Sequence, residues 1–383
     1  MRRASGELRA MKLFVPLLFS AVLAAAAARA ADETFYLGTY TKPNMSKGVY
    51  IGTIDSGTGK LGPLKLAGEA KDPSFVALSP NHKYLYACGE TSQSVIAFSI
   101  KSDGTLESLN KGDTGGGGPC HVWVDNTGGT VFAANYGGGS IAAFRTKPDG
   151  SIGERTEFIQ FNGAGADPKR QEKSHAHSIC TDAANKFVYA ADLGTDNVWI
   201  YKFDASAGKL TPTDPPSGKV EPGSGPRHIA IHPNGKFAFV CNEMAMTATA
   251  FTRDPATGAL KEIESVSTLP PGTDKKGLST AEIFCHPTGK WLYVANRTHD
   301  TIAVFTIADD GKITLIENAP AGVKVPRGFA LDPSGKWLIA GGQNDDKIAV
   351  LKIDQTTGKL TLTGETAEVG SPVCVLFVPE TKK

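Results

Sequence analysis

A pattern of two short apolar runs joined by a Gly turn occurs six times in this chain of 383 residues. One copy, GPRHIAIHPNGKFAFVCNE, covers residues 225–243, and the others begin at residues 72, 118, 176, 280 and 325. An alternating strand such as SVIAFSI or TIAVFTI follows the copies, and then a turn leads into a strand that begins with Gly-x-Leu or Gly-x-Ile. Equivalent positions are 46 to 57 residues apart. Each period therefore holds four short strands.

Four short strands in a period of this length are typical of a β-propeller blade. A seventh blade is split between the two ends of the chain. Residues 371–379 supply its first strand, and residues 35–40, 48–54 and 59–66 supply the other three. Closing a ring in this way removes the sheet edges that an open array would expose. We therefore predict an all-β fold, a single seven-bladed β-propeller domain over residues 31–383, with four antiparallel strands per blade.

The first 30 residues have the features of a targeting segment. Residues 11–30, MKLFVPLLFSAVLAAAAARA, contain a Lys after Met11, then an apolar run, then an A-x-A cleavage pattern. We predict a signal peptide over residues 1–30, with residues 1–10 as an upstream extension, and a mature protein in the periplasm or secreted. A retained membrane anchor is the alternative, but the apolar run is short and ends at Arg29.

Composition excludes several classes of partner and cofactor. The formal net charge is +1, so nothing in the charge balance indicates nucleic acid or stable membrane insertion. The six Cys form no C-x-x-C pair and no metal-ligand spacing, and several lie in apolar strand patterns, which indicates buried small hydrophobes. We expect a monomer that has no metal and no cofactor.

The charged residues of the repeat fall at its two ends. In a propeller blade the first strand is innermost and the second runs antiparallel to it. Arg227, His228 and Glu243 should therefore be neighbours at one mouth of the central channel. The same registers carry different polar groups in other blades, which favours a ligand site over the water-filled channel that is the alternative reading. The candidate substrate-binding residues are His121, Asn135, Tyr136, His175, His228, Glu282, Arg327 and Gln343.

Several motifs together resemble the seven-bladed propeller lactonases, a family that includes propeller-type 6-phosphogluconolactonases and carboxy-muconate cyclases. The motifs are FYLGTYT near the N-terminus, ANYGGGS, SHAHSI, GPRHIAIHPNGK followed by NE, and VANR followed by DTIAVF. The resemblance covers essentially all of the mature chain. It implies a lactonase that binds a small-molecule lactone or sugar acid, with four catalytic residues, His177, Arg227, Glu243 and Arg297.

A lactone carbonyl needs a donor for its developing oxyanion, a base for water and an acid for the leaving alkoxide. Arg227 and Arg297 can hold the substrate and the oxyanion, whereas either His177 or Glu243 can serve as the acid–base group. We expect Glu243 to be ionised, His177 to titrate near neutrality and the chemistry to need no metal. Two alternatives are a lactonising cyclase of a muconate-type acid and an exported propeller that binds a ligand or protein partner without catalysis.

Two features depart from the family motifs. Cys120 precedes His121 in GPCH, and its effect on the site is open. An insertion, NGAGADPKRQEKS at residues 162–174, precedes the His segment. Its Lys169, Arg170 and Lys173 could meet an anionic substrate, but a charge run of this kind favours a solvated loop.

Overall fold

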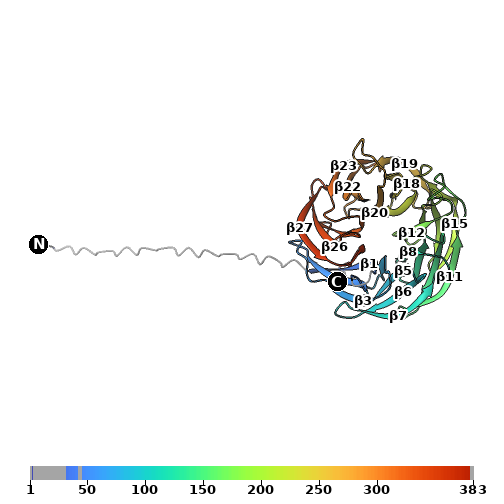
Figure 1. Ribbon diagram of the computed structural model, residues 1–383, viewed down its shortest axis with the longest axis horizontal. Helices are drawn as coiled ribbons and strands as arrows, with labels where there is room; N and C mark the ends of the chain where they lie inside the picture. Colours follow the sequence, from blue (N-terminus) through green and yellow to red (C-terminus); the bar gives the residue numbers. More distant parts are fainter. Residues whose placement is uncertain (1, 3–31, 42–44, 380–383) are drawn as a thin grey trace.

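Seven four-stranded antiparallel sheets are arranged around a common axis (Figure 1). The computed structural model describes residue 2 and residues 32–41 and 45–379, and its regular elements are 28 β-strands. These residues contain no helix that is long and apolar enough to cross a membrane. The predicted all-β, seven-bladed propeller is confirmed. The predicted signal peptide over residues 1–30 lies outside the described residues, apart from residue 2.

Each sheet has its innermost strand first and its outermost strand last. The split sheet consists of β28 (Pro372–Phe377), β1 (Asp32–Thr39), β2 (Gly48–Asp55) and β3 (Lys65–Glu69). The next three sheets consist of β4 (Val76–Leu78), β5 (Tyr84–Gly89), β6 (Ser94–Ile100) and β7 (Leu106–Asp113); β8 (Pro119–Val124), β9 (Thr130–Asn135), β10 (Ser140–Thr146) and β11 (Ile152–Gln160); and β12 (Ala176–Thr181), β13 (Phe187–Asp192), β14 (Asn197–Asp204) and β15 (Lys209–Lys219).

The remaining three sheets complete the ring in the same strand order. They consist of β16 (Pro226–Ile231), β17 (Phe237–Asn242), β18 (Thr247–Arg253) and β19 (Leu260–Ser267); β20 (Ser279–Cys285), β21 (Trp291–Arg297), β22 (Thr301–Ile307) and β23 (Ile313–Pro320); and β24 (Pro326–Leu331), β25 (Trp337–Gly342), β26 (Lys347–Ile353) and β27 (Leu360–Glu368).

The ring closes where β28 pairs antiparallel with β1, as the sequence predicts. Figure 1 shows the C-terminal end of the chain beside β1 and β3. The rings of Phe35 and Phe377 lie 5.8 Å apart across this pair. One boundary is wrong: the outer strand of the split blade is Lys65–Glu69 and not residues 59–66. Pro63 has no N–H for a ladder bond, and Leu61 forms only an isolated bridge with Ile54.

The hydrophobic core lies between blades. Seven apolar clusters are found in the described residues, and each one draws its side chains from two neighbouring sheets. None of the six Cys is in a disulfide; five are buried and Cys285 is partly buried, which confirms their assignment as small hydrophobes. Because every blade packs against two others, no blade buries its faces alone.

A tyrosine hydrogen bond recurs between neighbouring blades. The Tyr293 hydroxyl, on the second strand of its sheet, donates to the Gly358 carbonyl oxygen in the β26–β27 turn of the next sheet at 2.8 Å. The corresponding bonds from Tyr36, Tyr86 and Tyr189 to Gly104, Gly150 and Gly258 are each 2.9 Å long. These turns are therefore tied to the adjacent blade at a fixed height.

We expect Tyr293→Phe to lower the free energy of unfolding by about 1–2 kcal/mol, because the buried Gly358 carbonyl loses its donor. The control is Tyr84→Phe, since the Tyr84 hydroxyl lies in an exposed environment and 3.3 Å from the Pro148 oxygen. Urea denaturation of both variants measures the difference. Equal losses in the two variants would contradict a structural role for the recurring bond.

Candidate active site

The starts of the inner strands converge on a small polar pocket at one face of the ring. The pocket has a volume of about 200 Å³. Its walls come from five blades and from the insertion that precedes β12. The lining residues are Glu90, Cys120, Tyr136, Arg170, His177, Glu243, Arg297 and Arg327.

A β-bulge at the start of the inner strand aims these side chains. In the β16–β17 pair, Pro226 faces Asn242 and His228 faces Cys241, so Arg227 is an extra residue with no opposite partner. The same shift makes Cys120, His177 and Arg327 the extra residues of β8, β12 and β24. Side chains alternate in a regular strand, and a bulge breaks that alternation. Arg227 and His228 can therefore both point into the channel although they are consecutive.

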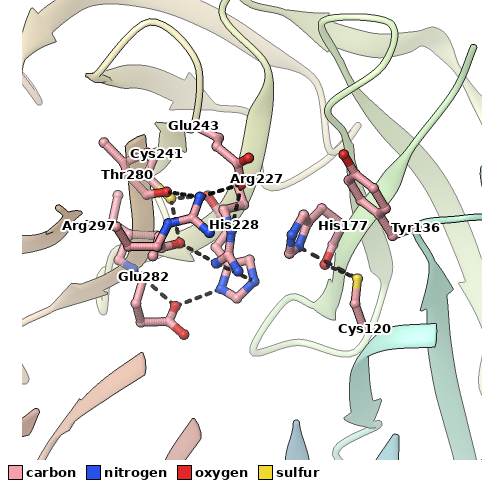
Figure 2. Close-up of polar contacts among 12 residues, drawn as sticks. Cys120, Tyr136, His177, Arg227, His228, Cys241, Glu243, Thr280, Glu282 and Arg297 are labelled. Atoms are coloured by element: carbon pink, nitrogen blue, oxygen red, sulfur yellow. Dashed lines mark hydrogen bonds and ion pairs between the residues drawn. The ribbon is translucent and has the colours of Figure 1, made fainter. Parts of the chain in front are cut away.

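Glu243 is the centre of an ion-pair cluster formed by three arginines. Its Oε2 lies 3.1 Å from Arg227 Nε and 2.8 Å from Arg297 Nη2, and its Oε1 lies 2.6 Å from Arg170 Nη2. Figure 2 shows Arg227 and Arg297 meeting beside Glu243, with His177 across from them. Arg227 is 2% exposed, and its Nη1 also donates to the Ala281 carbonyl oxygen.

The charges of this cluster decide its protonation. Burial alone would raise the pKa of Glu243, but Arg297, Arg227 and Arg170 outweigh burial and lower it to about 2. Burial and repulsion from Arg227 and Arg327 lower the pKa of Arg297 to about 10, despite the attraction of Glu243. At neutral pH Glu243 is therefore a carboxylate, as expected, and Arg297 is a cation.

His177 is a buried, neutral imidazole on the opposite wall. Burial, reinforced by the positive charge of Arg227, lowers the pKa of His177 well below 6.5. The expectation that His177 titrates near neutrality is therefore wrong, because the sequence does not show its burial. Its Nδ1 lies 3.6 Å from Cys120 Sγ. Burial raises the pKa of Cys120 to about 12, so this neighbour is a thiol and not a thiolate.

Two glycines let the chain that leads to His177 pass between neighbouring turns. A Cβ on Gly194 would lie 1.9 Å from the Lys173 carbonyl oxygen, and one on Gly139 would lie 2.3 Å from the Ser174 carbonyl oxygen. The His175 N–H donates to Asp192 Oδ1 at 2.7 Å. The backbone just before His177 is therefore held from three sides.

A second polar layer lies below the pocket. Arg227 Nη1 lies 3.1 Å from His228 Nε2, and His228 Nδ1 lies 2.7 Å from Glu282 Oε1. A guanidinium only donates, so Nε2 accepts and the proton of the neutral imidazole is on Nδ1, facing Glu282. Burial raises the pKa of Glu282 to about 7, although Arg227 opposes the shift. Figure 2 shows this chain of contacts from Arg227 to Glu282.

The same layer caps a second cavity, of about 270 Å³, that follows the inner strands away from the mouth. His121 stacks on Phe75 at 4.1 Å between ring centroids, and it lies edge-on to His228 at 5.2 Å. Most of the other lining residues are apolar, among them Ile231 and Phe284. His121, His228 and Glu282 thus belong to the channel and not to the mouth pocket.

Three predicted substrate-binding residues line neither cavity. The Asn135 amide donates to Ser140 Oγ at 3.0 Å inside its blade. His175 uses Nδ1 toward the Tyr136 carbonyl oxygen at 2.9 Å and Nε2 toward Glu172 at 3.2 Å. Gln343 is partly buried, and its backbone N–H donates to the Val325 carbonyl oxygen. The structure brings the other predicted residues together, in the pocket or in the layer below it.

Three lining residues were not selected from the sequence. Glu90 holds the register of Glu243 in another blade, so the repeat itself could have identified it. The departure at Cys120 was noticed without a role. Arg170 was assigned to a solvated loop, but it reaches Glu243 and donates to the Tyr136 hydroxyl at 3.2 Å. Its insertion lies outside the repeat, so no register could place it.

The described residues contain no group of three or more His, Cys, Asp or Glu side chains that could hold a metal ion. The polar groups of the pocket are instead guanidinium donors, two carboxylates, a thiol, a phenol and an imidazole. Such a set can bind an anion, polarise a carbonyl and move a proton.

The profile of the family described as "Lactonase, 7-bladed beta-propeller" matches residues 34–377. A 6-phosphogluconolactonase of Bacillus subtilis (strain 168) is 35% identical over 347 residues, which are 90% of this chain and 97% of that protein. A 6-phosphogluconolactonase of Formosa agariphila is 32% identical over 85% of this chain and 94% of its own. A crystal structure from Bacteroides fragilis NCTC 9343 has a TM-score of 0.85 and 33% identity, and it covers 92% of this chain and 99% of its own.

The raised pKa of Glu282 predicts a pH-dependent cost. Between pH 4.5 and about 7 the folded protein holds this proton more tightly than the unfolded chain, so stability falls as pH rises through that window. We expect wild type to lose about 3 kcal/mol relative to Glu282→Gln across it, at 1.36 kcal/mol per pH unit. Urea denaturation at several pH values measures this. The control is Glu107→Gln, whose side chain is 62% exposed; curves for Glu282→Gln parallel to wild type would contradict the prediction.

Proposed function

This chain belongs to the seven-bladed β-propeller lactonase family and is a lactonase, and we propose that it hydrolyses a sugar-acid lactone in the mouth pocket by metal-free acid–base chemistry. The observation that carries the proposal is the pairing of opposites on the pocket walls. A neutral imidazole, His177, faces arginines that an ionised carboxylate, Glu243, holds in place.

His177 is the proposed acid–base residue. Cys120 occupies the side of Nδ1, and Nε2 makes no hydrogen bond to a described residue, so Nε2 is free to act on a ligand. A water that attacks the lactone carbonyl carbon gives its proton to this nitrogen. The ring C–O bond then breaks, and the leaving alkoxide takes the proton from the imidazolium. Lactone and water become one hydroxy acid, and His177 returns to its neutral form.

Arg297 is the proposed donor to the developing oxyanion. Its Nη2 is bound to Glu243 and to the Thr280 carbonyl oxygen, but its Nε is buried without an acceptor among the described residues. An unpaired charged donor in a buried site is stronger than one in water, and it needs no reorganisation when the oxyanion forms. Arg327 adds a second cation on the wall, with its guanidinium 5.5 Å from the centroid of the Tyr40 ring.

Glu243 acts as an electrostatic anchor in this proposal and not as the general base. A carboxylate whose pKa is about 2 has little affinity for a proton at neutral pH. Its two oxygens instead orient the guanidinium groups of Arg227, Arg297 and Arg170. Of the two acid–base candidates that the sequence leaves open, burial and charge favour His177.

The size and charge of the pocket favour a small sugar acid. Its volume of about 200 Å³ lies below the ~300–1,000 Å³ of pockets that hold drug-sized ligands. The relatives from B. subtilis and F. agariphila are named for a phosphorylated gluconolactone. We further propose an exported protein, because residues 11–30 have the pattern of a signal peptide; amino-terminal sequencing of the exported protein should start near Ala31, and an intact Met1 or Met11 would contradict it.

The direct test is hydrolysis of glucono-lactone and 6-phosphoglucono-lactone, followed by proton release, with and without EDTA. We expect turnover by wild type that survives EDTA and falls about 10²–10⁴-fold in His177→Ala, the usual contribution of a general base. The control is His232→Ala, because His232 lies in the β16–β17 turn at the other end of its strand from the mouth. Turnover of His177→Ala within tenfold of wild type would overturn the role of His177, and loss in EDTA would overturn the metal-free proposal.

The pH profile follows from the lowered pKa of His177. The neutral imidazole is the active form, and burial lets it persist below pH 6.5. We expect kcat/KM to stay level from pH 8 to 6.5 and to fall only as the pH drops further and His177 takes up a proton. Stopped-flow assays, corrected for spontaneous lactone opening, measure the profile. An acidic limb with its midpoint at or above pH 6.5 would contradict the assignment.

A further inference from the structure

Arg170 extends from the insertion at residues 162–174 over the mouth of the pocket. Its Nη2 lies 2.6 Å from Glu243 Oε1 and 3.2 Å from the Tyr136 hydroxyl. Glu243 follows β17, whereas Tyr136 follows β9. Arg170 therefore bridges two blades across the opening, although nothing in the repeat provides an equivalent residue.

The backbone that carries Arg170 is anchored. The next residue, Gln171, is fully buried, and its Nε2 donates to the Leu193 carbonyl oxygen and to Asp196 Oδ1, both at 2.8 Å. On the other side, Asp167 Oδ1 accepts the N–H groups of Lys169 and Arg170 at 2.8 and 3.1 Å. The side chain of Arg170 thus stands on a fixed support while its guanidinium reaches into the mouth.

The mouth carries more positive than negative charge. Its wall has the carboxylates Glu90 and Glu243 against the guanidinium groups of Arg170, Arg297 and Arg327, and Arg227 adds a fourth cation through its bond to Glu243. Buried charge without a partner is costly, so a site of this composition is completed by an anion.

Among the three arginines that hold Glu243, Arg170 is the accessible one. Its side chain is 44% exposed, whereas those of Arg227 and Arg297 are 2% and 13% exposed. The two buried arginines can only meet groups that enter the pocket fully. Arg170 can meet a group that stays at the opening, at the far end of a ligand whose reacting carbonyl lies inside near Arg297 and His177.

We propose that Arg170 determines specificity for lactones that carry an anionic substituent, phosphate or carboxylate, at the end remote from the reacting carbonyl. The guanidinium gives up its bond to Glu243 Oε1 and pairs with the substituent, whose two oxygens match its fork. Glu243 keeps its bonds to Arg227 and Arg297, so the exchange leaves the inner site in place. This inference rests on the proposed function.

The test compares kcat/KM for three probes: neutral glucono-lactone, 6-phosphoglucono-lactone and glucaro-lactone, which has a free carboxylate. We expect Arg170→Gln to lower the ratio of 6-phosphoglucono-lactone to glucono-lactone about 10–100-fold, the worth of a charge-assisted hydrogen bond. Arg170→Lys should restore part of it. The control is Lys169→Gln, an exposed cation of the same turn, which should keep the wild-type ratio. The ratio of glucaro-lactone to glucono-lactone shows whether carboxylate is read as well as phosphate.

Equal losses of kcat/KM for charged and neutral lactones in Arg170→Gln would overturn the proposal and leave Arg170 as a support for Glu243. Calorimetric binding of the open acids keeps the test independent of turnover. We expect wild type to bind 6-phosphogluconate at least tenfold more tightly than gluconate, and Arg170→Gln to lose that preference. If no lactone is hydrolysed, the proposed function fails while this binding still tests Arg170; a wild type without the preference overturns the inference.

Discussion

The antiparallel pairing of β28 with β1 joins the two ends of the chain, and the remaining features depend on the ring that it closes. Closure places the inner strands of neighbouring blades in contact around one axis, with their starts at one face. A β-bulge at those starts then turns an extra side chain, such as Arg227 or His177, toward the centre. The site is thus the sum of one local irregularity repeated by the blades.

Electrostatics explains why this convergence of polar groups is tolerated in a buried place. Glu243 keeps its charge because three arginines outweigh its loss of water, and those arginines are in turn oriented by its two oxygens. His177, with no carboxylate against it, stays neutral for the opposite reason. One layer below, Glu282 faces a neutral imidazole, and burial raises its pKa. Burial is common to all three residues, and the neighbouring charges decide the outcome.

Much of the fold and of the site could be predicted from the repeat. The period gave the blades, and the registers placed Arg227, Glu243, His177 and Arg297 at one mouth, because equivalent positions in a closed ring must lie at equal heights. The family motifs pointed to the same four residues, and the structure brings them together.

The rest depends on features that a repeat does not encode. Asn135 and His175 have suitable chemistry, but their side chains are used by partners inside the blades, which a register cannot show. The position of Arg170 depends on the anchoring of Gln171 in a segment without an equivalent in other blades. The pKa of His177 depends on burial by neighbouring blades and on the charge of Arg227, both of which are tertiary effects.

The central claim is that the mouth pocket binds the lactone and its product, with the carbonyl end between His177 and Arg297. A crystal structure with gluconate or 6-phosphogluconate tests it most directly. The account predicts the carboxylate of the acid within hydrogen-bond distance of Arg297 and His177, above the layer of His228 and Glu282. The same ligand ordered in the lower cavity beside Phe284, with an empty mouth, would contradict it.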